Sequence, residues 1–171
     1  MKQPEAYIDF EVYEDKTNFV GVAKATLPNI NFLTQQITGA GISGNVDAVL
    51  IGMVEAMSLS LEFRSATDAA VKLMRPEKHK IELRVAEQYW NTTKQEKEIM
   101  ADKYVCVVIP KTFAPGSVAP ASAADASGEY SVYYFAGYKD KKVLWEIDPF
   151  NYICKIGSKD YMKPVRKALG K

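Results

Sequence analysis

The chain has 171 residues, with 22 lysines and arginines against 21 aspartates and glutamates, so its net charge is +1. This length fits one domain over residues 1–171, and the near-zero charge gives no electrostatic reason to bind nucleic acid or an anionic membrane. No apolar run approaches the roughly 20 residues that a bilayer span needs, and the N-terminus does not resemble a signal peptide. We therefore expect no stable membrane association and a chain that is first used in a cytoplasm.

Alternating side chains predict strands over most of the chain. Residues 7–14 place Ile8, Phe10 and Val12 on one face, with the period of two expected of a strand that has one buried side. Similar patterns or short apolar runs predict strands over 19–27, 79–90, 104–109, 130–136, 142–148 and 152–156.

Only two short helices are expected. One covers 68–74, with Thr67 as its N-cap and Pro76 as its stop, and the other covers 161–169. The predicted fold class is therefore mainly β, a β-sandwich or barrel that carries one or two short helices.

Residues 31–64 are predicted to form one long antiparallel hairpin with a glycine-containing middle. Its two strands cover 32–38 and 57–64, and both have a period of two. The connecting residues 38–45 are too many for a tight turn and too apolar for a solvated loop. Ordering such an arm costs conformational entropy that an isolated domain would not recover. We therefore expect the arm to pack on another subunit.

Residues 111–128 are rich in proline, alanine, serine and glycine. This composition predicts a loop or a loosely ordered insertion. Too little chain follows it to form a second core, so we do not interpret it as a domain linker.

The residues that could carry chemistry are few, and we predict no catalytic, metal or cofactor site. His79 is the only histidine, and an ordinary surface or strand-end position is the expected one. Asp9 and Glu11 share a strand face, where a solvated surface, which could also line a channel, is expected. Cys106 and Cys154 are expected to be buried free thiols. The alternative, a disulfide, requires them to be neighbours in space and is disfavoured in a cytoplasm.

Gly39, Gly41 and Gly44 match the G-x-G-x-x-G pattern of dinucleotide-binding proteins. That site also needs a preceding apolar strand and a following helix, and here the preceding residues are polar while residues 45–52 do not begin a helix. We interpret these glycines as allowing backbone bends and close approach between chains.

Aromatic residues are concentrated in the C-terminal third of the chain. Core and interface packing is the favoured interpretation. The alternative is a monomeric β domain that binds single-stranded nucleic acid or a small ligand through this cluster; a β-sandwich hydrolase is a third class with few candidate groups. The cluster consists of Tyr130, Tyr133, Tyr134, Phe135, Tyr138, Trp145, Phe150 and Tyr152.

Four segments carry a recognisable pattern in this order: NFVGVAKATLP (18–28), ITGAGISG followed by NVD and GMVEAM (37–57), the hairpin that ends in EIDPFN (133–151), and KIGSKD followed by VRKALG (155–170). Together they resemble the major tail tube proteins of contractile-tailed bacteriophages and of R-type tailocins. The ordered set spans nearly the whole chain, and residues 111–128 depart from it.

The resemblance implies a structural virion protein with a β-barrel-like tail-tube fold, not an enzyme, and no cofactor. Its subunits would form hexameric rings that stack helically into the inner tube of a contractile tail. The implied partners are further copies of this chain, the tail sheath protein, the baseplate or tube initiator, and the tape measure protein, with DNA in transit only in a phage. The protein would be located in a virion tail or tailocin particle, which is assembled in the bacterial host cytoplasm.

The predicted sites are contact surfaces. The polar faces of the strands that flank the arm are candidates for the lumen: Gln36, Ser58, Ser60 and Glu62. The residues expected to make the inter-subunit contacts of the arm are Ile37, Gly39, Gly41, Ile42, Gly44, Val46, Val49, Leu50, Ile51 and Met53.

Overall fold

The structure is a computed structural model that describes residues 1–171, and it confirms the prediction of a mainly β fold with two short helices. Neither helix is long and apolar enough to cross a membrane. The helices are α1 (Asp68–Lys72) and α2 (Lys163–Ala168). The strands are β1 (Lys2–Glu14), β2 (Asn18–Val20), β3 (Lys24–Thr26), β4 (Phe32–Ile37), β5 (Val46–Val54), β6 (Met57–Phe63), β7 (His79–Asn91), β8 (Glu96–Ala114), β9 (Ala126–Lys139), β10 (Lys142–Asp148), β11 (Ile153–Ile156) and β12 (Lys159–Asp160).

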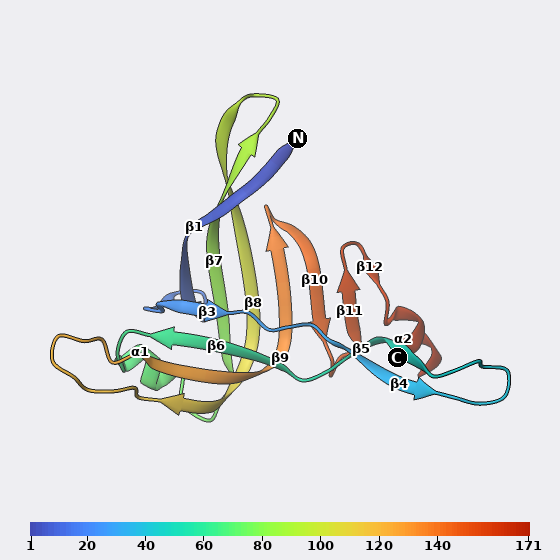
Figure 1. Ribbon diagram of the computed structural model, residues 1–171. Coiled ribbons are helices and arrows are strands. Elements are labelled where there is room, and N and C mark those ends of the chain that lie inside the picture. The colour runs from blue at the N-terminus through green and yellow to red at the C-terminus, as the bar shows by residue number, and fades with distance from the viewer.

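One ten-stranded sheet makes up most of the molecule, and it folds over on itself (Figure 1). Its main path runs in the order β12-β11-β10-β9-β8-β7-β1-β2, while β6 pairs with β9 and β3 off this path. The two longest strands, β8 and β9, pair along most of their length and so belong to both halves. Their register shifts near Val108 and Pro110, where bulges let a strand pair bend.

A hydrophobic core fills the space between the two halves of the sheet. Strand β6 contributes one side of it, because Leu59, Leu61 and Phe63 are fully buried while the intervening side chains are not. From the other strands, Tyr130 and Phe135 are buried against them. The alternation expected of these strands is therefore present, and it places β6 in the centre of the fold.

The predicted hairpin over 31–64 is wrong in its second strand. The observed hairpin pairs β4 with β5, so that residues 46–54 supply the return strand. Residues 57–63 instead pair with β3 and β9 in the main sheet. A period of two identifies a buried face but does not identify the pairing partner, which is why β6 was assigned to the wrong neighbour.

Other element boundaries also differ from the prediction. The loop expected over 111–128 is shorter, because β8 continues to Ala114 and β9 begins at Ala126. The strand expected over 19–27 is divided into β2 and β3. In β1, register shifts between Pro4 and Ala6 and between Tyr7 and Asp9 interrupt the alternation and leave Ile8 exposed.

The start of α1 is as predicted. The Thr67 Oγ1 accepts a hydrogen bond from the Ala70 backbone N–H at 3.3 Å, which satisfies one of the free N–H groups of the first turn. The helix ends at Lys72, two residues before the expected end at residue 74 and well before Pro76.

Candidate functional site

Strands β4 and β5 form a two-stranded sheet of their own, separate from the main sheet. In Figure 1 this hairpin projects from one end of the molecule, beside α2 and β11. We call residues 32–54 the arm. An isolated two-stranded hairpin is only marginally stable in water, so the arm depends on contacts at its root and on whatever covers its free part.

The root of the arm is fixed against α2 and β11. A Cβ atom added at Gly52 would lie 2.3 Å from the Met162 Sδ and 3.4 Å from the Cys154 Cβ, and Gly52 has φ +71°. Only glycine combines that backbone conformation with so close an approach. The root is therefore packed into the body of the subunit, in contact with the buried side chain of Met162.

Along β5, alternate apolar residues on both sides of Gly52 form an apolar row that has no cover in the subunit. The exposed fractions of Val49, Ile51 and Met53 are 61%, 68% and 47%. They alternate in sequence with Leu50, Gly52 and Val54, which are only half-exposed. Several exposed apolar side chains close together in one strand indicate an interaction site.

The tip of the arm contains the three glycines of the G-x-G-x-x-G pattern. Gly39, Gly41 and Gly44 have φ values of +149°, +89° and +131°, and an added Cβ would meet nothing within 4 Å at any of them. The backbone conformation, rather than crowding within the subunit, therefore explains glycine here. Ile37, Ile42 and Val46 are exposed around the same tip, and their contacts with another chain stay a prediction.

The candidate lumen residues divide into two groups. Ser58, Ser60 and Glu62 lie together on the face of β6 that points away from the core. Glu62 is paired in register with Lys24 of β3. Gln36 lies apart from them on β4 of the arm, so the structure does not bring the four residues to one surface.

Two edges of the main sheet are open in the part that contains β6. Strand β3 pairs only with β6, and β8 pairs with β7 no further than Val108, so residues 109–114 pair with β9 alone. Unpaired strand edges carry free N–H and C=O groups that another chain can bind. The sequence patterns did not predict these edges, because they depend on where the neighbouring strands stop.

His79 is at a strand end, as predicted, but it is buried and not on the surface. Its Nε2 donates to the Arg75 carbonyl oxygen at 2.9 Å, and its Nδ1 lies 2.7 Å from Glu14 Oε1. Lys72 Nζ lies 3.4 Å from the other oxygen of Glu14. These contacts connect β1, α1 and the start of β7, which is a structural role.

The two cysteines are buried and free, as predicted. Burial raises the pKa of the Cys106 thiol to about 12, and it also raises the pKa of the Cys154 thiol. A thiol that resists ionisation is a poor nucleophile and metal ligand. No group of three or more His, Cys, Asp and Glu side chains is placed to hold a metal ion.

Four of the eight residues of the aromatic cluster lie in or against the core: Tyr130, Phe135, Trp145 and Tyr152. Trp145 stacks on Tyr104 with 5.9 Å between ring centroids and meets Phe135 at 5.3 Å. Tyr130 is almost fully buried. Phe150 is exposed but stacks on Tyr133 at 5.6 Å. These rings pack on one another, and the favoured interpretation of the cluster as packing agrees with that arrangement.

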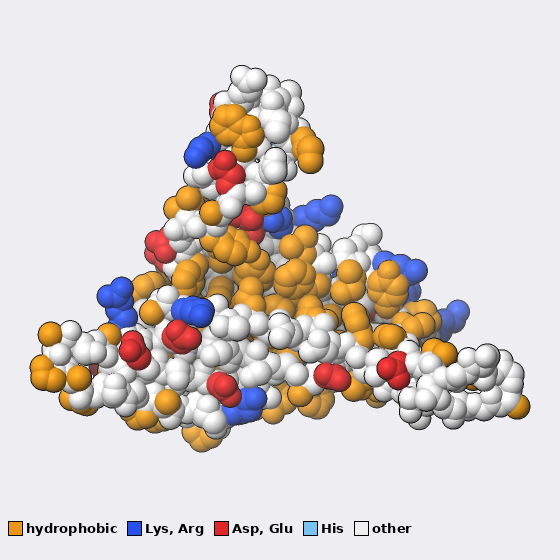
Figure 2. Space-filling view, in the orientation of Figure 1, with side chains coloured by type: hydrophobic (Ala, Val, Ile, Leu, Met, Phe, Trp, Pro, Cys, Tyr) orange, Lys and Arg blue, Asp and Glu red, His pale blue; other side chains and the backbone are white.

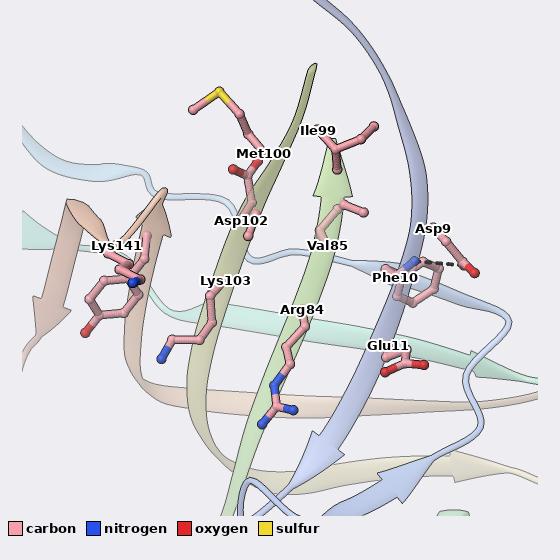
Figure 3. Close-up of a pocket in the computed structure, with 13 residues that line it drawn as sticks. Asp9, Phe10, Glu11, Arg84, Val85, Ile99, Met100, Asp102, Lys103 and Lys141 are labelled. Atoms are coloured by element: carbon pink, nitrogen blue, oxygen red, sulfur yellow. Dashed lines mark hydrogen bonds between the residues drawn. The ribbon is translucent and has the colours of Figure 1, made fainter. Parts of the chain in front are cut away.

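A groove of about 750 Å³ lies on one face of β1, β7, β8 and β9 (Figure 3). In the close-up, Arg84 and Lys103 extend from neighbouring strands, and Asp9 and Glu11 approach from β1. Tyr138 and several apolar side chains complete the lining. The charged groups of the groove are of both signs and give it no single affinity for an anion or a cation.

Asp102, beside this groove, belongs to a buried charged group. The residue is 3% exposed and its Oδ1 has no hydrogen-bond partner. Lys139 Nζ lies 2.8 Å from Glu87 Oε2 and 3.8 Å from Asp102 Oδ2, so one cation serves two carboxyl groups. Burial, followed by the adjacent Glu87, raises the pKa of Asp102 to about 6. Burial also opposes ionisation of Glu87, but hydrogen bonds from Lys139 and Tyr89 lower its pKa overall.

Replacing Asp102 with asparagine should therefore stabilise the subunit at pH 8. A carboxyl group with a raised pKa in the folded state destabilises the fold when it is ionised, above about pH 6, and has no such effect below the pKa of the unfolded chain. We expect Asp102→Asn to raise the free energy of unfolding by about 1–3 kcal/mol at pH 8 and by little at pH 4. Urea unfolding at both pH values measures this. The exposed Asp47→Asn is the control, and a loss of stability at pH 8 would contradict the interpretation.

Comparison with known proteins gives one family and several distant structures. The family described as phage tail tube protein FII matches residues 4–170. No curated protein is significantly similar in sequence. The sheath/tube terminator of an extracellular contractile injection system (PVC, extended state) shares 11% identity with a TM-score of 0.57, over 79% of this chain and 96% of that one. A chain of the anti-feeding prophage (AFP) baseplate shares 12% identity with a TM-score of 0.49, over 81% and 97%.

Proposed function

Because this chain belongs to the phage tail tube protein family and is therefore a structural subunit of a tail tube, we propose that it forms hexameric rings that stack into the inner tube of a contractile tail. The tube serves as the conduit for DNA ejection in a phage or as the puncturing tube of a tailocin. The monomeric nucleic-acid or ligand binder has no support in the family match.

The arm is the observation that carries this proposal. Its apolar row of Val49, Ile51 and Met53 is open to solvent in a single subunit, and the arm pairs with no other strand of its own chain. Burying an aliphatic side chain is worth about 1.5–3 kcal/mol. Another copy of the chain, packed over this row in the assembled tube, recovers that free energy in every subunit.

The open edges of the sheet favour closure into a ring. The free edge of β3 and the free edge of residues 109–114 lie on opposite sides of the part of the sheet that contains β6. A contact between two different edges is heterologous, so each added subunit leaves one edge free for the next. No free edge remains once the series closes into a ring. Closure hides both edges from uncontrolled association.

We propose that the polar face of β6 lines the lumen. Ser58, Ser60 and Glu62 lie on it, and residues 25–63 contain no lysine or arginine. Basic residues would hold the phosphates of passing DNA. Strand β6 carries none, and Lys24, which lies opposite Glu62 on β3, has its charge offset by that carboxylate. Gln36 stays a weaker candidate because it lies on the arm.

The partners of the assembled tube follow from the same proposal. They are the sheath around the tube, the baseplate or initiator from which it grows and the tape measure protein inside it. DNA passes through it only in a phage. The site of assembly is the cytoplasm of the bacterial host, and the site of action is the virion tail or tailocin particle.

Negative-stain microscopy of concentrated purified protein tests the proposal directly. Six-fold rings or short hollow tubes are the expected result. A chain that remains monomeric at high concentration, alone and with the initiator protein present, would contradict it.

Replacing Gly41 with valine should reduce ring and tube formation. Gly41 has φ +89° with open space around it, and a β-branched residue is strained in that backbone region, so the tip must change its conformation. The strain costs about 1–3 kcal/mol. Tube yield by sedimentation measures the effect. Ser43→Val places the same side chain in the same loop at a residue without positive φ, and it should assemble more nearly like the native protein.

A further inference from the structure

Part of the main sheet continues beyond the hydrophobic core. Residues 2–9 of β1, 86–91 of β7 and 96–101 of β8 form three paired strands, and Figure 1 shows them rising above the rest of the sheet. We call these residues the extension. In the space-filling view it stands clear of the body (Figure 2), so its root is the place where it joins the core.

The ion pairs within the extension are weak. Lys2 pairs with Glu98 at 2.7 Å and Lys97 pairs with Glu5 at 3.8 Å, and the lysine side chains are largely exposed. Exposed ion pairs contribute little to stability. Two register shifts also interrupt the pairing of its β1 strand. A segment held in this way opens locally more readily than a packed core does.

Three charged side chains meet at the root of the extension, on one face of the sheet. Val85 of β7 and Lys139 of β9 both lie opposite Asp102 of β8, and Glu87 is the next residue of β7 on that face. Tyr104, two residues along β8 on the same face, belongs to the core. Asp102 therefore occupies the first position beyond the core, and both carboxyl groups are nearly buried there.

The charged groups that face Asp102 are Glu87 and Lys139, so one cation is present for two carboxyl groups. Lys139 Nζ lies 2.8 Å from Glu87 Oε2, and the Tyr89 hydroxyl donates to the same oxygen at 2.7 Å. Asp102 Oδ2 lies 3.8 Å from Lys139 Nζ, and its Oδ1 accepts no hydrogen bond. When Asp102 is protonated, the other two groups neutralise each other. When it is ionised, an unmatched negative charge is buried at the root.

The other titratable groups around the cluster do not compensate for this charge. They are phenols: Tyr89, Tyr104, and Tyr7 of β1, whose hydroxyl lies 3.5 Å from that of Tyr104. Burial raises the pKa of Tyr89 and Tyr104. Burial lowers the pKa of Lys139, but its hydrogen bonds outweigh burial and raise it overall. Burial, followed by the neighbouring carboxylate, raises the pKa of Asp102 to about 6, so Asp102 is the group of this cluster whose charge changes in mildly acidic solution.

We propose that Asp102 is a proton-operated lock on the extension. When its carboxyl group carries a proton, the root is neutral and the extension stays closed on the core. When the proton is lost, the extension opens more often, because opening admits water to the unmatched carboxylate. The closed state therefore loses stability as the pH rises from the ordinary aspartate range to about 6. The lock lies within one subunit and does not depend on the proposed tube.

Hydrogen exchange of the full-length protein at pH 4.5 and 7.5, corrected for the exchange rates of free amides, measures this opening. We expect the amides of 86–91 and 96–101 to be at least fivefold less protected at pH 7.5, relative to the core amides of β6. Asp102→Asn, which cannot ionise, should keep the extension protected at both pH values. Glu87→Gln leaves Lys139 to Asp102 alone, so the loss of protection should move to lower pH.

Asp47→Asn is the matched control, because it removes an exposed carboxyl group from the arm; it should behave as the native protein does. Equal protection of the native extension at both pH values overturns the proposal. So does pH-dependent opening that persists in Asp102→Asn, since another group would then be responsible. A loss of protection that is equally large in β6 also overturns it, because the proton would then act on the whole fold and not on the extension.

Discussion

Replacing Val49 and Ile51 together with aspartate should give a folded subunit that no longer forms rings or tubes. Both side chains are largely exposed in the single subunit, so the free energy of unfolding should change by less than about 1 kcal/mol. In the assembled tube the two substitutions remove the burial of two aliphatic side chains, worth about 3–6 kcal/mol per contact. They also introduce carboxylates that would be buried without partners.

Such a loss weakens each subunit contact by more than about a hundredfold. Analytical ultracentrifugation measures the oligomeric state, and circular dichroism with urea confirms the fold. Val49→Ile/Ile51→Val keeps the row apolar and should assemble normally. If the double aspartate variant still forms tubes, the exposed row is not an inter-subunit contact.

Replacing Leu61 with alanine should strongly destabilise the single subunit. Leu61 is fully buried in the core, and leucine-to-alanine changes at such sites cost about 2–5 kcal/mol because the removed atoms leave a cavity. Ser60→Ala, the next residue and on the other face of β6, should change stability by no more than about 0.5 kcal/mol. Urea unfolding of the two variants measures the difference.

This pair of variants also tests the position of β6 in the fold. In the hairpin expected from the sequence over 31–64, Leu61 would belong to a projecting arm. Its truncation would then affect assembly and leave the stability of the single subunit nearly unchanged. In the observed fold Leu61 is on β6, which pairs with β3 and β9. Its truncation should therefore lower the stability of the single subunit first, and affect assembly only through that loss.

Several features of the site were predictable from the residues alone. The alternation of Leu59, Leu61 and Phe63 with polar residues identified a strand with one buried face. The glycines at 39, 41 and 44 indicated a bent, irregular tip, and their positive φ values agree with that. The apolar residues at 49, 51 and 53 were expected to make inter-subunit contacts; they are exposed in the subunit, and the contacts stay a prediction.

Other features were not accessible to pattern analysis. The burial of His79 depends on Glu14 and on the Arg75 carbonyl, and Glu14 lies 65 residues away in the chain. The raised pKa of Asp102 requires Glu87 and Lys139 from two other strands.

For this protein, the sequence by itself determined the class of the fold, most of the strands, the capped start of α1, and an arm with more apolar surface than one subunit can cover. Only the tertiary structure decided which strand returns from the arm, which edges of the sheet are open, and which charges remain unpaired. The reason is physical: periodicity and turn chemistry arise from neighbouring residues, whereas strand pairing and charge neutralisation arise from residues that come together only when the chain has folded.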